Sequence, residues 1–211
     1  TYIIMNALWI HIPFLITLAA GDAVAADGSN GIFRLTLIRP VSRLKILLSK
    51  LLASYIYSAG LVIFCAFWSL GIGSLVLGTG DLIVLDNGIL VLNEGQAWIR
   101  MLLSFSLAIV VMCMVSTLCF MFSSMVNNGI GPIIGAMFLI IVGYIIIAIP
   151  LDFFTKIEPY VFVSYFNVWL DAFKDPIPWL LIGKKISVLI TYSLIFFGIS
   201  AFVFLNKDIK S

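Results

Sequence analysis

The sequence predicts an all-α membrane protein, a polytopic bundle of transmembrane helices. Of its 211 residues, 63% are hydrophobic and 10% are charged, and the mean hydropathy is +1.19. Soluble domains are about half apolar and about a quarter charged, so this composition exceeds what a water-surrounded core can bury. Long apolar runs recur without the alternation of barrel strands, and lipid cannot satisfy a free backbone, so each run is expected to be a helix.

Five stretches are long and apolar enough to cross a membrane, since a spanning helix needs about 20 mainly apolar residues. They cover residues 2–20, 51–78, 98–123, 130–150 and 186–206. The chain begins at Thr1 and is hydrophobic from its second residue, without the basic leader or small-residue cleavage site of a signal peptide. We expect one further span before Thr1, six spans in the full protein, and a single transmembrane domain over residues 1–211.

The connecting segments predict the orientation. Segments 21–50, 124–129 and 207–211 fall on one side and hold seven Lys or Arg against three Asp, whereas the segments on the other side hold more acids than bases. Short loops rich in Lys and Arg stay in the cytoplasm. We therefore expect a multi-pass protein of the cell membrane, with the 21–50 loop and the C-terminus cytoplasmic.

The expected external segment, residues 151–185, is apolar and aromatic, but its pieces "PYVFVSYFNVWLDAF" and "PIPWLLIG" are too short to span. Tyr160, Tyr165, Trp169 and Trp179 suit the water–lipid boundary, where an apolar ring with a polar edge is favoured. Two interpretations remain open: short helices that dip into the outer leaflet, including a partly re-entrant hairpin, and a plain aromatic belt.

The residues required for catalysis or metal binding are not found together. The three cysteines, Cys65, Cys113 and Cys119, are odd in number and contain no CxxC pair, which argues against a disulfide framework and a metal site. We interpret them as small apolar residues within helices. The run "GTGD" at 78–81 resembles a motif of intramembrane aspartyl proteases, which need two carboxylates facing each other in the membrane. Asp81 lies at the outer end of one span, and Asp22, its possible partner, lies at the inner end of another. We expect no enzyme activity and no catalytic, cofactor-binding or metal-binding residue in this chain.

The centres of the predicted spans carry no Asp, Glu, Lys or Arg. Ion-driven carriers usually place such groups or broken helices at mid-depth, so a self-powered carrier is disfavoured. His11 is the single histidine, and it lies in the first span near Pro13. An ionisable residue at that depth is a functional candidate, and a hydrogen-bonded packing role is the alternative.

The 21–50 loop stands out because five cations, Arg34, Arg39, Arg43, Lys45 and Lys50, fall close together. The stretch "IFRLTLIR" threads apolar residues between the first two, Pro40 ends it, and Ser42 is a suitable N-cap for the next helix. Such a piece lies along the membrane or docks into a groove of a partner. The plainer alternative is that the cations anchor the loop to anionic lipid headgroups.

The order of residues in this loop resembles the first cytoplasmic loop of ATP-binding-cassette (ABC) type-2 permeases. In that family an acid is followed four residues later by Gly, then by an apolar run, Pro-hydrophobic-Ser-Arg, and a Lys at the head of the next span. Here these are Asp27, Gly31, 40–43 ("PVSR") and Lys50. The chain departs from the family in having Asp27 in place of Glu and Ile-Phe in place of Thr-Leu after Gly31. The terminal "FLNKDIKS" also resembles the tail of these subunits.

The resemblance implies that the loop forms a cytoplasmic coupling helix, which sits in a groove of a separate ABC ATPase subunit. Two permeases, identical or paralogous, and two ATPases would make an exporter. ATP and Mg²⁺ would bind in the ATPase and not in this chain. The residues implied in partner contact, or in fixing the loop, are Asp27, Phe33, Arg34, Leu35, Leu37, Arg39 and Arg43.

In this family the path for substrate runs between the two permeases, along the spans that correspond here to residues 2–20 and 130–150. Asn6, His11 and Tyr144 are polar points in these spans. A mostly apolar wall suits a lipid-like, peptide or drug-like substrate. Two alternatives remain: a non-transporting membrane protein that relays ATPase motion to an external partner, and a channel or carrier that works alone.

Overall fold

The computed structural model describes residues 11–21, 23, 25, 42–85, 89–126 and 128–206. A short helix, His11–Gly21, comes first. The elements that follow are α3 (Arg43–Leu77), the strands β1 (Leu82–Leu85) and β2 (Ile89–Leu92), α4 (Glu94–Met125), α5 (Ile130–Ala148), α6 (Asp152–Ile157), the 3₁₀ helices η1 (Glu158–Tyr160) and η2 (Phe162–Phe173), and α7 (Trp179–Asn206).

The prediction of an all-α membrane bundle is confirmed for the described residues, where four helices are long and apolar enough to cross a membrane: α3, α4, α5 and α7. Of the first expected span, residues 2–20, the described part is the helix His11–Gly21, and residues 1–10 lie outside the described residues. Three helices begin earlier than the hydropathy pattern predicts, α4 by four residues and α3 and α7 by more. α3 starts at Arg43 rather than at residue 51, and α7 starts at Trp179, directly after Pro178.

These early starts have local causes. Residues 43–50 are mostly Leu, Lys, Arg and Ile, of which all but Ile are strong helix formers, and the Lys45 amide donates to the Ser42 carbonyl at 3.0 Å. At α7, the Ile182 amide donates to the Pro178 carbonyl at 3.0 Å. Proline is favoured at a helix start because its missing amide hydrogen would have no partner there.

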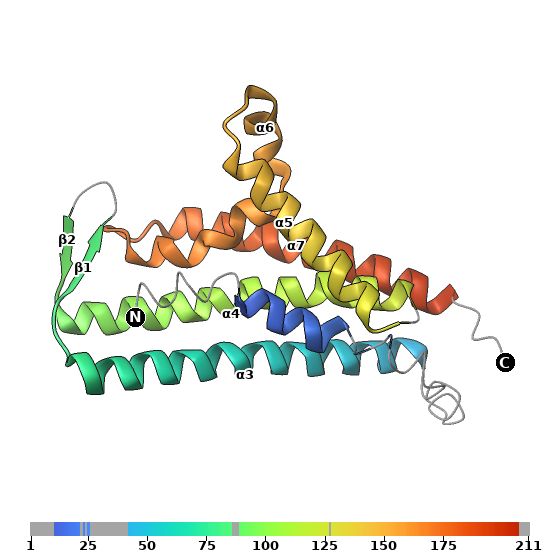
Figure 1. The fold of residues 1–211 in the computed structure, drawn as a ribbon, viewed down its shortest axis with the longest axis horizontal. Coiled ribbons are helices and arrows are strands. Elements are labelled where there is room, and N and C mark those ends of the chain that lie inside the picture. The colour runs from blue at the N-terminus through green and yellow to red at the C-terminus, as the bar shows by residue number, and fades with distance from the viewer. Residues whose placement is uncertain are drawn as a thin grey trace.

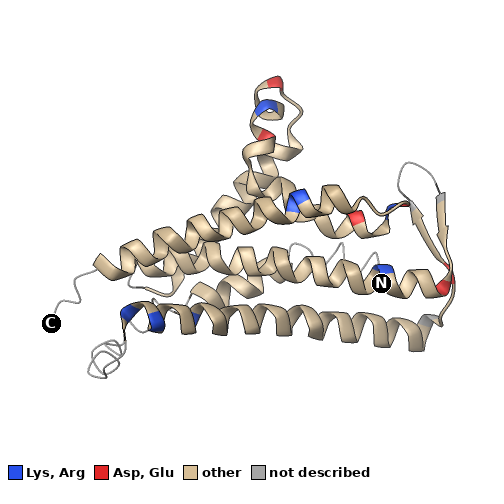
Figure 2. Cartoon of the chain, turned by 180° about the vertical axis from the view of Figure 1, so that it is seen from behind, with Lys and Arg blue, Asp and Glu red and all other residues tan. Residues whose placement is uncertain are grey.

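α3, α4 and α7 lie side by side along the length of the molecule, while α5 crosses at an angle and carries α6 away from the bundle (Figure 1). The start of α3, the α4–α5 turn and the end of α7 lie at one end, which we call the basic end. The antiparallel hairpin of β1 and β2, in which Ile83 pairs with Val91, lies at the opposite end with the start of α7. We call this the hairpin end. Most charged residues lie toward these two ends or on α6, and the long stretches between them are uncharged (Figure 2).

α4 is the central helix. In its most apolar window, 72% of the residues are buried inside the protein, against 11% for α3, 22% for α5 and 17% for α7. The buried face of α4 alternates large apolar residues with small or hydroxyl-bearing ones, including Ser104, Ala108, Ser116 and Cys119. Small residues let neighbouring helix backbones approach closely where lipid offers no hydrophobic drive to associate. The outer helices leave their apolar surface for lipid.

The aromatic segment divides between the core and the surface. Tyr160 and Trp179 are 78% and 62% exposed, so both rings lie on the surface of the protein. Trp169, expected at that boundary, is instead buried with Phe166 and Phe173, because η2 packs against α4, α5 and α7. The periodic apolar residues of η2 cover the side of α4, and the segment therefore completes the bundle instead of forming only a belt.

The close approach of α5 to η2 depends on Gly143. A Cβ atom at this position would lie 2.5 Å from Val163 Cγ2 and 3.0 Å from Val163 Cβ. We expect Gly143→Ala to destabilise the protein by about 1–3 kcal/mol through overpacking, measured as a lower Tm in detergent. Gly198→Ala on α7 is the matched control, since a Cβ there meets nothing within 4 Å. Equal Tm values for the two variants would contradict this account of the α5–η2 contact.

Candidate functional site

The basic end is the first candidate site, because it bounds the loop that sequence analysis singled out. Arg43, Lys45 and Lys50 all lie in the first turns of α3. The Lys50 ammonium donates a hydrogen bond to the Ala23 carbonyl oxygen at 2.6 Å, and the Arg43 guanidinium donates to the Leu205 carbonyl oxygen at 3.3 Å. The first bond ties α3 to Ala23, which is itself helical, and the second ties α3 to the end of α7.

Ser123 of α4 holds the other side of the same loop. Its hydroxyl donates to the Gly21 carbonyl oxygen at 2.6 Å and accepts the Ala25 amide hydrogen at 2.9 Å. Gly21 itself packs against α4 and α5, since a Cβ there would meet Ile133 Cγ1 at 2.8 Å and Cys119 Sγ at 3.3 Å. One serine therefore bonds the backbone at two points one helical turn apart, Gly21 and Ala25, at the close contact of three helices.

Together these bonds attach both ends of the loop to the bundle. Before the undescribed part of the loop, Ala25 is bonded to Ser123 of α4, and Ala23 is bonded to Lys50 of α3. Arg43, on the exit side, is bonded to α7. A force on the loop would therefore act on three spanning helices at once. Of the residues implied in partner contact, Arg43 is the one that the structure describes; Asp27, Phe33, Arg34, Leu35, Leu37 and Arg39 lie outside the described residues.

The three polar points expected along a substrate path are not brought together as a site by the described contacts. His11, the first residue that the structure describes, is exposed, and Asn6 lies outside the described residues. Tyr144 of α5 faces η2, where its ring meets Phe166 edge-on with the centroids 6.5 Å apart. The ring of Tyr144 thus contributes to the packing of α5 on η2.

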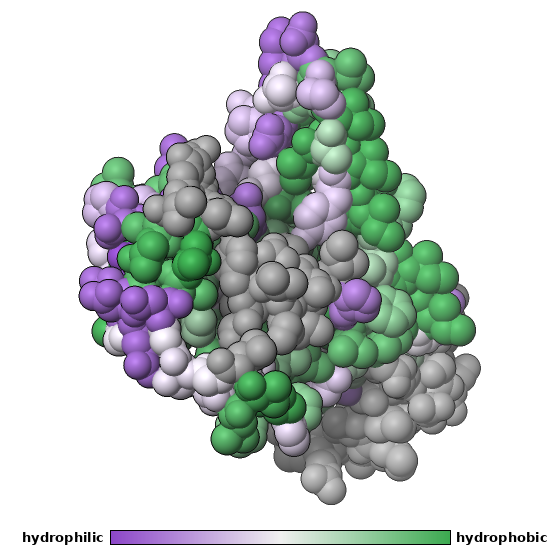
Figure 3. Space-filling model, turned by 60° about the vertical axis from the view of Figure 1, so that its left-hand side comes forward, coloured by the Kyte–Doolittle hydropathy of each residue, from purple (hydrophilic) through white to green (hydrophobic). Residues whose placement is uncertain are grey.

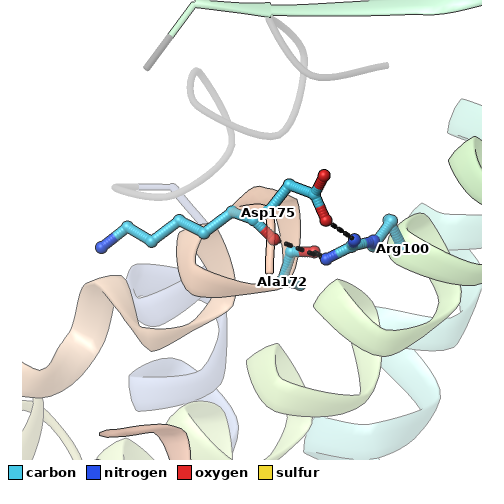
Figure 4. A network of polar contacts seen from close by, with 4 residues as sticks. Arg100, Ala172 and Asp175 are labelled. Carbon is cyan, nitrogen blue, oxygen red and sulfur yellow. Dashed lines mark hydrogen bonds and ion pairs between the residues drawn. The ribbon is translucent and has the colours of Figure 1, made fainter. Parts of the chain in front are cut away.

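A second polar cluster lies toward the hairpin end. Arg100 of α4 is 9% exposed, and its guanidinium donates to the Ala172 carbonyl oxygen at 3.1 Å, to the Lys174 carbonyl oxygen at 2.6 Å and to the Asp175 carboxylate at 3.2 Å. Figure 4 shows the guanidinium reaching from α4 to the chain that follows η2. Arg100 therefore acts as a cap for the last carbonyl oxygens of η2.

Asp171 of η2 extends this cluster to α7. The residue is 2% exposed, and its two carboxylate oxygens accept from Lys185 of α7 at 2.5 Å and from Lys174 at 2.8 Å. A carboxylate buried to this degree needs a paired cation. The cluster thus joins α4, η2 and α7. The charges were visible in the sequence as loop residues, but their pairing needs contacts between segments that are far apart in the chain.

Among the described residues, no three His, Cys, Asp or Glu side chains are grouped closely enough to hold a metal ion. Ser123 is the residue of the basic end that sequence analysis missed, because a serine near the end of a span has no pattern that marks it as an anchor.

The fold and its charged ends define a polytopic membrane protein with four described helices that can span a bilayer. Residues 1–210 match the family described as "Protein of unknown function (DUF2705)", and the chain belongs to this family. It is 28% identical over 209 residues to "Uncharacterized protein YhcI" of Bacillus subtilis (strain 168), a match that covers 94% of this chain and 64% of that relative's length. No solved structure matches the chain.

The pairing of Asp171 makes a prediction about stability. Asp171→Asn leaves Lys185, whose side chain is 16% exposed, without its carboxylate partner. Breaking a buried pair by removing one member costs about 3–5 kcal/mol, so we expect a loss of that order in denaturant unfolding in detergent. Lys174→Met removes the exposed partner, 42% accessible at its side chain, and should cost less than about 1 kcal/mol. Equal losses for the two variants would contradict the assignment of Lys185 as the main partner.

Proposed function

We propose that this chain is the membrane subunit of an ABC exporter, driven by a separate cytoplasmic ATPase subunit. The observation that carries the proposal is the double attachment of the loop: Ser123 and Lys50 hold the chain before it, and Arg43 ties its exit to α7. A loop that only anchors the protein to lipid has no need of bonds to three helices. The resemblance of residues 21–50 to the coupling loop of type-2 permeases supports the same function.

In the proposed mechanism, the 21–50 loop docks into a groove of the ATPase through its segment from Asp27 to Arg43, with the basic end in the cytoplasm. The apolar Phe33, Leu35 and Leu37 fill the groove, and Arg34, Arg39 and Arg43 pair with acids of the ATPase or fix the loop. ATP binding closes the ATPase dimer and moves the loop. Because the loop is bonded to α3, α4 and α7, these helices move with it and switch a path between two permease copies.

The uncharged interior supports an apolar or amphiphilic cargo. Residues 51–80, 101–125, 130–148 and 186–206 contain no Asp, Glu, Lys or Arg. A path along such helices offers no charged side chain that would compensate an ion or a sugar for its lost hydration. The proposed cargo class is therefore lipid-like, peptide or drug-like.

A relay without transport is the second candidate, and the hairpin favours it. Ile83 and Val91 pair across β1 and β2 and are 61% and 55% exposed, at the end opposite the loop. An apolar pair on an exposed hairpin is a surface that an external partner can cover. In this case ATPase motion would reach a protein outside the membrane, and no cargo would raise the ATPase rate.

The docking step is tested by purifying the full protein in mild detergent and measuring how much nucleotide-binding subunit accompanies it. We expect a stoichiometric ATPase with the native chain, and at least about a tenfold loss with Phe33→Asp, because a charge placed in an apolar groove is strongly disfavoured. Lys156→Ala on α6 is the control, since it changes a cation far from the basic end. An ATPase that stays bound to Phe33→Asp, or is absent from the native sample, would refute docking through this loop.

The anchoring step has a separate readout. Ser123→Ala removes two hydrogen bonds to backbone groups at the start of the loop, each worth about 1 kcal/mol. We expect the ATPase to bind this variant as it binds the native chain, while stimulation of ATP hydrolysis by cargo falls several-fold. Ser106→Ala, whose hydroxyl bonds only within α4, is the matched control. Unchanged stimulation in Ser123→Ala would show that the anchors do not transmit motion.

A further inference from the structure

A hollow of about 350 Å³ lies at the hairpin end, between the last turns of α3 and the first turns of α4. Its α3 side and the following turn supply Leu70, Ser74, Thr79 and Asp81, among others, and its α4 side supplies Ala97, Trp98 and Met101. Figure 3 brings this end of the molecule forward and shows hydrophilic residues beside apolar ones. The "GTGD" run at 78–81 forms one wall.

The length of α3 indicates where this hollow lies across the bilayer. A helix rises 1.5 Å per residue, so Leu70 lies about 30 Å along α3 from Lys50. The apolar core of a bilayer is also about 30 Å thick. With Lys50 at one headgroup layer, Leu70 reaches the opposite boundary, and Asp81 lies in the polar layer beyond it.

The lining changes character along this direction. Leu70 and Met101 form the part nearest the apolar layer, because α3 and α4 run in opposite directions there. Ser74 and Trp98 come next, and Thr79 and Asp81 lie at the outer part. An occupant that follows this gradient has an apolar part directed toward the bilayer and a polar part directed toward water.

The outer part of the hollow favours a cation. Asp81 is exposed and makes no hydrogen bond or ion pair among the described residues. α3 ends at Gly78, which lines the same hollow, and the last carbonyl oxygens of a helix have no partner within it. Glu94 lies one turn before Trp98 on the same face of α4, where it offsets the positive end of that helix.

Positive groups of the protein are directed elsewhere. The hollow is lined by no Lys or Arg among the described residues, and the nearby Arg100 is bonded to Ala172, Lys174 and Asp175. Trp98, which is 36% exposed, lines the hollow, and the face of an indole ring attracts cations more strongly than other aromatic rings do.

From this arrangement we propose that the hollow binds amphiphilic ammonium compounds, with the cationic nitrogen between Asp81 and Trp98 and the apolar part against Leu70 and Met101. The site is independent of the proposed coupling to an ATPase. Its ligand is either the ammonium headgroup of a membrane lipid or a free apolar amine, which share this chemistry.

The test uses the full chain, purified without any ATPase, in vesicles of phosphatidylglycerol. The probe is an alkylammonium that carries a photoreactive diazirine in its chain, and the labelled peptides are identified by mass spectrometry. We expect labels on the segments around Leu70 and Met101. Competition by added phosphatidylethanolamine identifies a lipid headgroup as the ligand, and competition by phenethylammonium in water identifies a free amine.

Variants separate the proposed contacts from general partitioning into lipid. Asp81→Asn should reduce labelling by about three- to fivefold, the effect of losing one exposed ion pair, whereas Asp81→Glu keeps it. Asp152→Asn removes an exposed acid on α6 and should leave labelling unchanged. Labelling that is insensitive to Asp81→Asn, equal labelling by a carboxylate probe of the same chain, or a lack of competition by both amines would overturn the proposal. Because the ATPase is absent, none of these outcomes bears on the coupling loop.

Discussion

The packing of α4 is the constraint on which the rest of the structure depends. Lipid is as apolar as leucine, so helices in a bilayer associate through close contact and hydrogen bonds rather than through burial from water. α4 meets this requirement with small and hydroxyl-bearing residues along its buried faces. Thr117 lies 2.7 Å from the Tyr55 hydroxyl of α3, and the Cys119 sulfur lies 3.3 Å from the Thr17 carbonyl oxygen. Each neighbouring element is thus fixed by its contact with one central helix.

The same constraint moves the stronger polar interactions to the two ends of α4. Ser123 binds the end of the first helix at the basic end, and Arg100 binds the end of η2 toward the hairpin end. Arg100 satisfies carbonyl oxygens that the end of η2 leaves without partners, and Ser123 bonds two backbone groups one helical turn apart. Because both lie on one long helix, a displacement at the basic end and the packing of η2 are mechanically connected through α4.

The two proposals concern opposite ends of the molecule and different chemistry. The basic end offers a loop attached to three helices, which suits the transfer of force from a cytoplasmic partner. The hairpin end offers a hollow with an acid, an aromatic ring and an apolar floor, which suits recognition of a small amphiphile. Long uncharged helices separate the two proposed sites.

The sequence by itself determined the class of protein, the positions of four spans and the separation of charges between the two ends, because these follow from composition and local periodicity. Tertiary structure decided what lies in the core. Trp169 and Asp171 have the composition of a boundary segment, yet both are buried, since η2 fits against α4 and α7. Ser123 and Lys50 are anchors only because the chain around Gly21 and Ala23 passes beside them. Such pairings depend on the contact of segments far apart in the chain, which hydropathy and spacing do not encode.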